Sequence, residues 1–254
     1  MGPRLLFLSC MAVATVGVAL WLAVSGLPDG EGAVRQNSLE ERVRRYLIAH
    51  PEVLNEAADA FQRRRQREET AARIKVMSEL KATLRTTGGL PTLGNPGADV
   101  TVVEFFDYRC PYCKQALGEL QQLVSEDKNV RLVFREFPIL GPDSLVASRA
   151  AIAAREQGKY LEMHRALMSH TGALDEKKVM EIAEGHGVDI TRLRADMEKP
   201  QVMAKIKESL ALAGRLGIEA TPTLIIGDEV HAGYAEIAIL KDLVGRARAG
   251  CKSC

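Results

Sequence analysis

The sequence has almost no net charge and few cysteines. Its 254 residues include 34 Lys and Arg against 33 Asp and Glu, which gives a formal net charge of +1 at pH 7. A general nucleic-acid-binding surface needs a basic excess, so this balance argues against nucleic acid as a partner. Five cysteines are too few for a small fold held together by disulfides. The hydrophobic share of 46% is normal for a folded domain and excludes a wholly disordered chain.

Charge is absent from one long stretch near the amino terminus. Residues 5–27 carry no charged side chain, and about 20 apolar residues suffice to cross a bilayer. Arg4 precedes the stretch and Asp29 follows it, which predicts that the rest of the chain is exported. We expect a signal anchor in the inner membrane, or a cleaved signal peptide that ends near Ala23-Val24-Ser25. Either alternative places the remainder in a periplasmic or other extracytoplasmic, oxidising compartment.

Residues 28–89 are predicted to form a linker and a helical stalk. Glycine, proline and charge over 28–36 indicate the linker, and Ser38 with Glu41 forms the S-x-x-E pattern that opens a helix. Two apolar stripes follow at helical spacing: Leu39, Val43, Leu47, Leu54 and Phe61, then Ile74, Met77, Leu80 and Leu84. Such a helix buries its stripes against its own domain or against another copy of the chain, and the second alternative predicts a homo-oligomer.

A redox motif follows a predicted strand. Residues 100–106 (VTVVEFF) are rich in β-branched and aromatic residues, Cys110-Pro111-Tyr112-Cys113 comes next, and 130–134 predict another strand after a helical pattern. A Cys-x-x-Cys between strand and helix is typical of a thioredoxin-like redox site. The helix amino terminus favours the Cys110 thiolate, and Pro111 suits the first turn. Cys113 lies one turn further on the same face and can attack a mixed disulfide on Cys110.

Other interpretations of this cysteine pair fit less well. A zinc site needs a second Cys or His pair at suitable spacing, and a purely structural disulfide would close too short a loop to stabilise much. A second signal supports redox chemistry. Thr221-Pro222 stands where a proline opens a strand near the end of the chain, and a cis-proline loop that faces the cysteines would fit there. A final helix is predicted over 236–248.

The stretch from Val103 to Cys113 (VEFFDYRCPYC), together with Ala220-Thr221-Pro222-Thr223, resembles the DsbA family of thiol:disulfide interchange proteins. The likeness is greatest to the ScsC-like members and covers roughly residues 38–248. It implies an α/β thioredoxin fold with a helical insertion over 90–250, preceded by the stalk and by the transmembrane or signal segment.

The same resemblance implies roles for five residues. Cys110 would be the attacking cysteine and Cys113 the resolving one. Thr221 and Pro222 would form the cis-proline loop, whose backbone pairs with a bound substrate strand. Glu104 matches a buried acid that relays protons in the family; the alternative is a strand carboxylate with a structural partner. His164 is expected to be structural, because no Ser, Cys or acid is spaced to use it.

The predicted function is extracytoplasmic disulfide exchange with protein substrates, without a cofactor. The motif does not fix the direction of electron flow, which depends on the reduction potential and on the redox partner, expected in the membrane. Thr221 before the proline leans, by family likeness, towards isomerase or reductase, and oxidase activity stays open.

A second Cys-x-x-Cys, Cys251-Lys252-Ser253-Cys254, ends the sequence. Its thiols are expected to form an inert disulfide, to relay electrons to Cys110, or to bind Cu(I), which prefers soft sulfur ligands. Copper binding would make this a copper-binding or copper-tolerance protein, the alternative function. Because Cys10 lies in the apolar stretch, no cysteine is left for an ordinary structural bridge.

Overall fold

The computed structural model describes residues 30–85 and 89–250. The chain forms two compact units that divide between Arg67 and Glu68. The predicted membrane or signal segment at 5–27 and the cysteine tail at 251–254 lie outside the described residues. Among the residues that are described, no helix is long and apolar enough to cross a membrane.

The amino-terminal unit is helical from its first described residue. Helix α2 spans Gly30–Ala49, and α3 begins at Glu52 and ends at Arg85. The break between them falls at Pro51, where the sequence predicts that the helix restarts. The predicted linker over 28–36 is wrong from Gly30 onward, and Ser38 lies inside α2 rather than at its start. The S-x-x-E pattern is short enough to occur inside a helix, and no proline interrupts α2.

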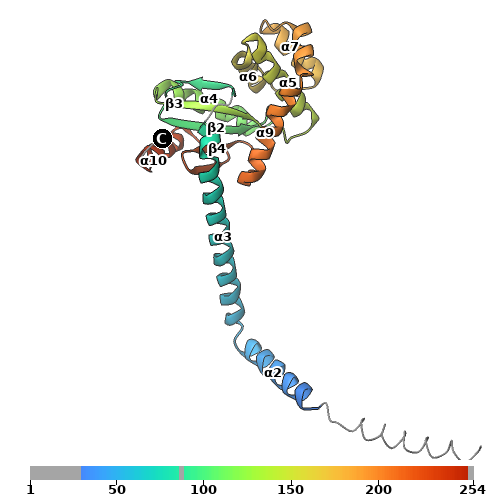
Figure 1. Cartoon of the computed structure of the whole chain (residues 1–254), viewed down its shortest axis with the longest axis vertical. Helices are drawn as coiled ribbons and strands as arrows, with labels where there is room; N and C mark the ends of the chain where they lie inside the picture. The colour runs from blue at the N-terminus through green and yellow to red at the C-terminus, as the bar shows by residue number, and fades with distance from the viewer. Residues whose placement is uncertain (1–29, 86–88, 251–254) are drawn as a thin grey trace, which may run out of the picture. The chain divides into compact units, whose positions relative to one another are not determined.

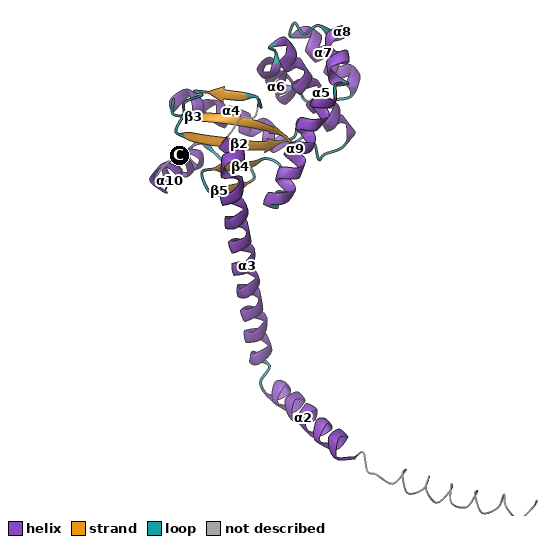
Figure 2. Ribbon diagram, in the orientation of Figure 1, coloured by secondary structure: helices purple, strands orange, loops and turns teal. Residues whose placement is uncertain are grey.

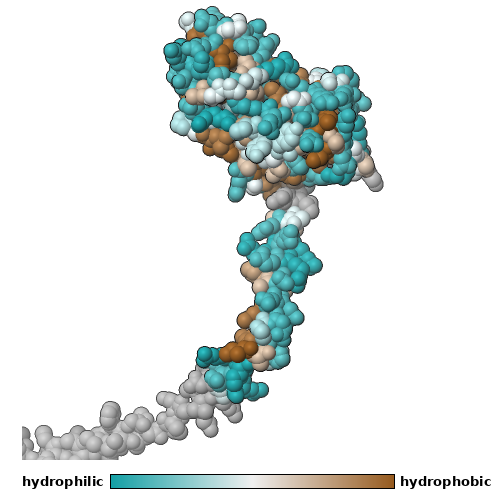
Figure 3. Space-filling view, turned by 180° about the vertical axis from the view of Figure 1, so that it is seen from behind, coloured by the Kyte–Doolittle hydropathy of each residue, from teal (hydrophilic) through white to brown (hydrophobic). Residues whose placement is uncertain are grey.

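The first apolar stripe is exposed to solvent within this unit, except for Leu47, which is half-buried. Leu54 and Phe61 are 55% and 61% exposed, and the same holds for the large apolar side chains of α2, namely Leu39, Val43, Tyr46 and Ile48. Figure 3 shows hydrophobic surface among the hydrophilic residues of these helices. The whole stripe lies in the amino-terminal unit, which ends at Arg67.

The second unit is built on one five-stranded sheet, which is drawn in Figures 1 and 2. Its strands run in the order β1-β3-β2-β4-β5. Strands β2 and β3 are parallel, and the other neighbours are antiparallel. The bounds are β1 Thr92–Gly94, β2 Val100–Phe106, β3 Val130–Glu136, β4 Thr223–Ile226 and β5 Glu229–Ala232. The two strands predicted at 100–106 and 130–134 are confirmed, and the second continues to Glu136.

Helices cover both faces of this sheet. Helix α4 joins β2 to β3, and a helical insertion lies between β3 and β4, as the sequence predicts. The bounds are α4 Pro111–Glu126, α5 Pro142–Ala154, η1 Arg155–Gln157, α6 Tyr160–Ser169, α7 Glu176–Gly185, α8 Ile190–Met197, α9 Pro200–Leu216 and α10 Ile237–Gly250. The final helix predicted over 236–248 corresponds to α10.

The central strands are buried on both faces, which explains their continuous apolar sequence. One core contains Val102, Phe106 and Phe134 with α4, the insertion and α10. The other contains Phe105 and Val133 with α9 and with the second apolar stripe, in which Met77, Leu80 and Leu84 are each 4% exposed. The last turns of α3 therefore bury their stripe against the sheet of their own unit.

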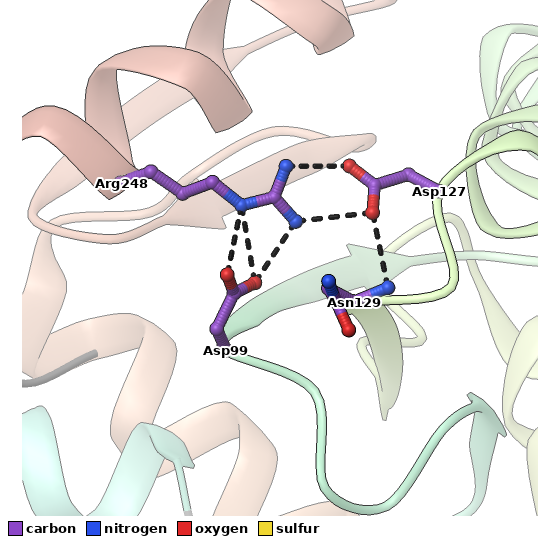
Figure 4. Close-up of polar contacts among 4 residues, drawn as sticks. All are labelled: Asp99, Asp127, Asn129 and Arg248. Carbon is purple, nitrogen blue, oxygen red and sulfur yellow. Dashed lines mark hydrogen bonds and ion pairs between the residues drawn. The ribbon is translucent and has the colours of Figure 1, made fainter.

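A polar clamp fixes the end of the sheet at which β2 begins (Figure 4). The guanidinium of Arg248 on α10 donates to Asp127 at 2.6 and 3.0 Å and to Asp99 at 2.9 to 3.1 Å. Asp127 also accepts the backbone N–H of Asn129 at 3.0 Å. Such two-pronged charge-assisted bonds are among the stronger polar contacts in proteins. They fix α10 at the opposite end of β2 from the redox motif.

Candidate active site

Cys110 stands at the point where β2 gives way to α4. The turn from Asp107 to Arg109 follows the strand, and the Cys110 N–H donates to the Asp107 carbonyl at 3.1 Å. Cys110 is the N-cap of α4, with φ −76° and ψ 117°, and Pro111 is the first helical residue. Its missing N–H costs nothing at that position. The predicted strand, Cys-x-x-Cys and helix arrangement is thus present.

The two cysteines have opposite ionisation properties. The pKa of Cys110 is lowered to about 5, mainly by a hydrogen bond from the Cys113 thiol, with smaller contributions from the Thr221 side chain and from the N–H groups of Cys113 and Tyr112. Burial raises the pKa of Cys113, which is fully buried, and the hydrogen bond to Cys110 and the nearby Glu104 carboxyl raise it further. Cys110 is therefore the thiolate at neutral pH, and Cys113 keeps its proton.

A cis-proline loop faces Cys110 from the far end of the chain. The peptide bond between Thr221 and Pro222 is cis. The Cys110 thiol sulfur lies 3.2 Å from the Thr221 carbonyl oxygen, to which the protonated thiol donates. Thr223, which begins β4, donates its hydroxyl to Ala220 at 2.7 Å and closes the loop. The structure thus brings together the two motifs that the sequence places at opposite ends of the domain.

Glu104 lies on β2 with its carboxyl in the interior. The residue is 1% exposed, and its Oε1 has no hydrogen-bond partner among the described residues. Burial raises the pKa of Glu104 to about 8, and repulsion from the Cys110 thiolate and from Glu136 adds to this. A carboxyl of this kind exchanges a proton near neutral pH. Its position next to both cysteines accords with the acid that the resemblance implies.

Asp107 is a site residue that the sequence reasoning missed. Its buried carboxylate accepts the N–H of Arg109 at 2.8 Å and the Ser144 hydroxyl at 2.7 Å. It also accepts the N–H groups of Ile139 and Leu140, both at 2.9 Å. One side chain thereby ties the Cys110 turn to the loop between β3 and α5. An acid directly after a buried strand and just before the cysteines was the available signal.

His164 lies in a buried aromatic and polar cluster beneath the site. Its ring stacks on Tyr160 with an interplanar angle of 17°, and its Nδ1 lies 3.1 Å from the Tyr108 hydroxyl. Burial lowers the pKa of His164 to about 3, so the ring is neutral. This environment accords with the structural role expected from the sequence. Glu136, which accepts the Tyr108 and Tyr160 hydroxyls, was not singled out by sequence.

The remaining predicted residues divide into two groups. Pro111 and Tyr112 lie between the cysteines, and the Tyr112 side chain is 60% exposed beside Cys110. Cys251 and Cys254 lie outside the described residues. Within the described ranges, no group of three His, Cys, Asp or Glu side chains is placed to hold a metal ion.

A strand, a Cys-x-x-Cys at a helix start and a facing cis-proline loop define the thioredoxin class of redox proteins. Residues 101–245 match the family model described as a DSBA-like thioredoxin domain. The chain belongs to this DsbA-like family, whose members are thiol:disulfide oxidoreductases. Residues 36–68 match a second model, described as the copper resistance protein ScsC N-terminal domain.

Solved structures share the fold. A thioredoxin-like oxidoreductase from Silicibacter pomeroyi DSS-3 is 50% identical, with a TM-score of 0.65 over 66% of this chain and 97% of that one. A periplasmic thioredoxin-like protein from Salmonella enterica serovar Typhimurium is 27% identical, with a TM-score of 0.61 over 67% of this chain and 96% of that one. Proteus mirabilis ScsC in a transitional conformation is 24% identical, with a TM-score of 0.63 over 86% and 99%, and shows the fold alone.

Curated relatives are longer proteins. The Na(+)/H(+) antiporter NhaA 1 of Salinispora arenicola (strain CNS-205) is 34% identical over 157 residues, which are 61% of this chain and 24% of the relative. The chain spans about a quarter of the length of the curated relatives that it matches. The likeness concerns one part of those proteins, and ion transport does not follow for this chain.

Proposed function

We propose that this chain is an extracytoplasmic enzyme that exchanges disulfides with protein substrates through Cys110 and Cys113, chiefly as an isomerase or reductase. One observation carries the proposal: a thiol whose pKa is lowered to about 5 lies 3.2 Å from the carbonyl of a cis-proline loop. The thiolate is the form that attacks disulfides, and such a loop offers backbone to a substrate strand.

The reaction follows from the different states of the two cysteines. The Cys110 thiolate attacks one sulfur of a substrate disulfide, that S–S bond breaks, and the other substrate sulfur leaves as a thiolate. Cys113 then loses its proton and attacks the Cys110 sulfur. The bond between Cys110 and the substrate breaks, the substrate sulfur leaves as a thiolate, and the Cys110–Cys113 disulfide forms, so that the substrate has gained two electrons. In isomerisation a second substrate thiolate attacks the mixed disulfide instead, and the enzyme leaves reduced.

Glu104 is proposed as the group that takes the proton from Cys113. Cys113 is fully buried and resists ionisation, so the resolving step needs a nearby base. Glu104 has a pKa raised to about 8 and an Oε1 with no hydrogen-bond partner in the described part of the chain. The ionised carboxylate accepts the proton, and the charge of the pair stays the same while Cys113 becomes the nucleophile.

The direction of exchange is the finer part of the proposal. A lowered Cys110 pKa makes this residue a good nucleophile and also a good leaving group, so it serves reduction and oxidation alike. Thr221 before the proline supports isomerase or reductase activity by family likeness. A membrane redox partner would then keep the pair reduced, and the periplasmic relative together with the apolar segment at 5–27 supports an extracytoplasmic, inner-membrane location.

A second copy of the chain is the proposed partner of the amino-terminal helices. Leu54 and Phe61 on α3 are spaced seven residues apart, the repeat that lets two helices share an apolar seam, and Leu47 lies on α2 before the break at Pro51. Leu54 and Phe61 are more than half exposed in the single chain. Joining several active sites would raise the local concentration of thiolate, which suits the shuffling of wrong disulfides.

The copper alternative has less support. Residues 36–68, which match the ScsC model, contain no cysteine and a single histidine. Anaerobic Cu(I) titration of wild type against Cys251→Ser/Cys254→Ser tests the tail, since equal stoichiometry would remove it as a ligand.

The assignment is tested with scrambled ribonuclease and with insulin. The full chain should restore ribonuclease activity and reduce insulin, and Cys110→Ser should do neither. Cys251→Ser/Cys254→Ser, which leaves the proposed site intact, is the matched control and should behave as wild type. Insulin reduction by Cys110→Ser would contradict the main assignment. If the protein reduces insulin but does not reactivate scrambled ribonuclease, it is a reductase, and the proposed isomerase activity is wrong.

A further inference from the structure

A second buried carboxyl, Glu136, lies behind the site and takes no part in the exchange steps above. Glu136 is 2% exposed and ends β3. Its Oε1 accepts the Tyr108 hydroxyl at 3.0 Å and the Tyr160 hydroxyl at 2.9 Å. The two hydroxyl donors satisfy this oxygen, whereas Oε2 has no hydrogen-bond partner among the described residues, which makes a charged Glu136 costly to bury.

The sheet register places Glu136 next to Glu104. Glu104 pairs with Phe134, and Phe106 pairs with Glu136, in the parallel ladder of β2 and β3. Because side chains alternate along a strand, Glu104, Phe106 and Glu136 share one face of the sheet. The two glutamates are diagonal neighbours, about 8 Å apart at Cα from the strand spacing and rise. Two buried carboxyls at this range resist being charged together.

The hydroxyl contacts also connect Glu136 to the turn that presents Cys110. Tyr108 lies two residues before Cys110 and is fully buried. Its hydroxyl bridges Glu136 and the Nδ1 of His164, which lies at 3.1 Å. His164 is neutral, so an Nδ1–H that donates to the Tyr108 oxygen leaves the Tyr108 hydrogen free for Glu136. The cluster therefore holds the turn from its buried side, as Asp107 holds it from the other.

We propose that Glu136 is a positioning residue for thiol exchange: through Tyr108 it fixes the Cys110 turn, and through its charge it controls when Glu104 ionises. The inference rests on the proposed function of Cys110, Cys113 and Glu104. Glu104 accepts the Cys113 proton only when ionised, and an ionised Glu136 opposes that state. The two carboxyls then titrate as a coupled pair rather than as independent groups.

Other groups around the pair are accounted for. Charge on Glu104 is opposed by the Cys110 thiolate as well as by Glu136. Burial raises the pKa of Glu136 to about 8, hydroxyl donors oppose this rise by favouring the charged form, and the Asp107 carboxylate adds to it. Other titratable or polar side chains that contact the pair or line the same small cavity are Cys113, Tyr108, Ser148, Arg155, Tyr160, Lys205 and Ser209. An amide at position 136 keeps an oxygen that can accept the Tyr108 and Tyr160 hydroxyls and removes the charge.

The test follows the two thiol steps separately in the full chain. Cys10, Cys251 and Cys254 are replaced by serine, and the reduced protein reacts with 5,5′-dithiobis(2-nitrobenzoate) in a stopped-flow mixer between pH 5 and 9.5. The first thionitrobenzoate release reports attack by Cys110, and the second reports resolution by Cys113. The variants are Glu136→Gln, Glu104→Gln and, as a matched control, Glu119→Gln, whose carboxyl accepts the Tyr234 hydroxyl at 2.9 Å.

In wild type the second phase should accelerate as Glu104 loses its proton. Removing the charge of Glu136 should lower the midpoint of that rise by about 0.5 to 1.5 pH units, the size expected for two charges about 8 Å apart at an effective dielectric constant of about 20 to 60. Glu104→Gln should abolish the rise, and Glu119→Gln should leave the midpoint unchanged. A merely structural loss would slow both phases without moving the midpoint.

Two results would overturn the inference or the function beneath it, and they differ. An unchanged midpoint in Glu136→Gln, or an equal shift in Glu119→Gln, removes the role of Glu136 while exchange by the cysteine pair stands. A wild-type protein without any second release removes the proposed function itself. Should Glu136→Gln not fold, Tyr160→Phe decides: it removes one donor that favours the charged Glu136, so the midpoint should fall by a smaller amount, and no fall contradicts the inference.

Discussion

The two ends of helix α3 carry similar apolar stripes and meet opposite surroundings. Leu54 and Phe61, near its start, are 55% and 61% exposed, whereas Leu80 and Leu84, near its end, are each 4% exposed in the core of the sheet. The division of the chain into two units falls between these pairs, at Arg67. Helical spacing therefore predicts an apolar face but not what covers it.

The chemistry follows the same division. Cys110, Glu104, Thr221 and Glu136 all belong to the unit that begins at Glu68. The reactive thiol, its acid and its loop are therefore complete without the exposed stripe. A substitution in one unit should therefore leave the stability or chemistry of the other unit intact.

The largest expected effect is the difference in reactivity between the two active-site thiols. Because the pKa of Cys110 is lowered to about 5, its alkylation by iodoacetamide should rise with pH around that value and level off by neutrality. At pH 7 it should be at least about a hundredfold faster than alkylation of the protonated Cys113. The measurement is mass spectrometry of the reduced protein after timed quenching.

The lowered pKa of Cys110 also makes the stability of the reduced fold depend on pH. The folded-state pKa of Cys110 lies below its unfolded value, so ionisation stabilises the reduced fold above the ordinary thiol range, and that stabilisation is lost as pH falls towards 5. The variant Leu54→Lys/Phe61→Lys serves as the control, since its Cys110 midpoint should equal that of wild type. A midpoint near 8.5, the value of a free thiol, would contradict the geometry of the site.

Loss of the resolving thiol should come next in size. Cys113→Ser should reduce turnover of insulin by about a hundredfold or more, because the mixed disulfide on Cys110 is no longer released from within. Non-reducing gels should show substrate bound covalently to the variant, and Cys251→Ser/Cys254→Ser should show none beyond wild type. Unchanged turnover would mean that another thiol resolves the complex.

Local patterns made the outline of the catalytic unit predictable. The strand ending at Phe106, the helix start at Pro111 and the loop at Pro222 each depend on residues close in sequence, and all three are present. The pairing of Cys110 with the loop at Thr221 was suggested by the proline at a strand start and by family likeness, because no local rule pairs residues so far apart. The linker at 28–36 was mispredicted since a short capping pattern does not exclude a longer helix.

Polar partners distant in sequence were not predictable in the same way. Glu136 and Tyr160 contact Tyr108 or each other only after the sheet and the insertion pack together. Asp107 likewise accepts hydrogen bonds from the N–H groups of Ile139 and Leu140, which are more than 30 residues away in sequence. Their side chains carry no periodic signal, so a single sequence shows polar residues near strand ends but not which of them meet.

Truncating an apolar side chain should cost more stability in the buried stripe of α3 than in its exposed stripe. Leu80→Ala removes a buried side chain and should cost about 2 to 4 kcal/mol of unfolding free energy. Leu54→Ala changes an exposed side chain on the same helix and should alter the unfolding of the catalytic unit by less than about 0.5 kcal/mol. Chemical denaturation followed by the fluorescence of catalytic-unit tyrosines measures both. Equal costs would show that the amino-terminal stripe is part of the same cooperative core.

The smallest expected effect on chemistry comes from the exposed stripe. Leu54→Lys/Phe61→Lys places charge in the seam proposed to join copies of the chain, where charge is costly to bury. Sedimentation should show a lower oligomeric state than wild type. Insulin reduction per chain should stay within about twofold because the thiolate is unchanged, whereas reactivation of scrambled ribonuclease should fall several-fold because linked active sites lose their shared local concentration.

Glu52→Lys, an exposed charge change near the start of α3, is the matched control and should leave both assays and the oligomeric state as in wild type. If the stripe variant sediments as wild type does, its apolar residues serve something other than self-association, and the separation of assembly from chemistry must be sought elsewhere in the chain.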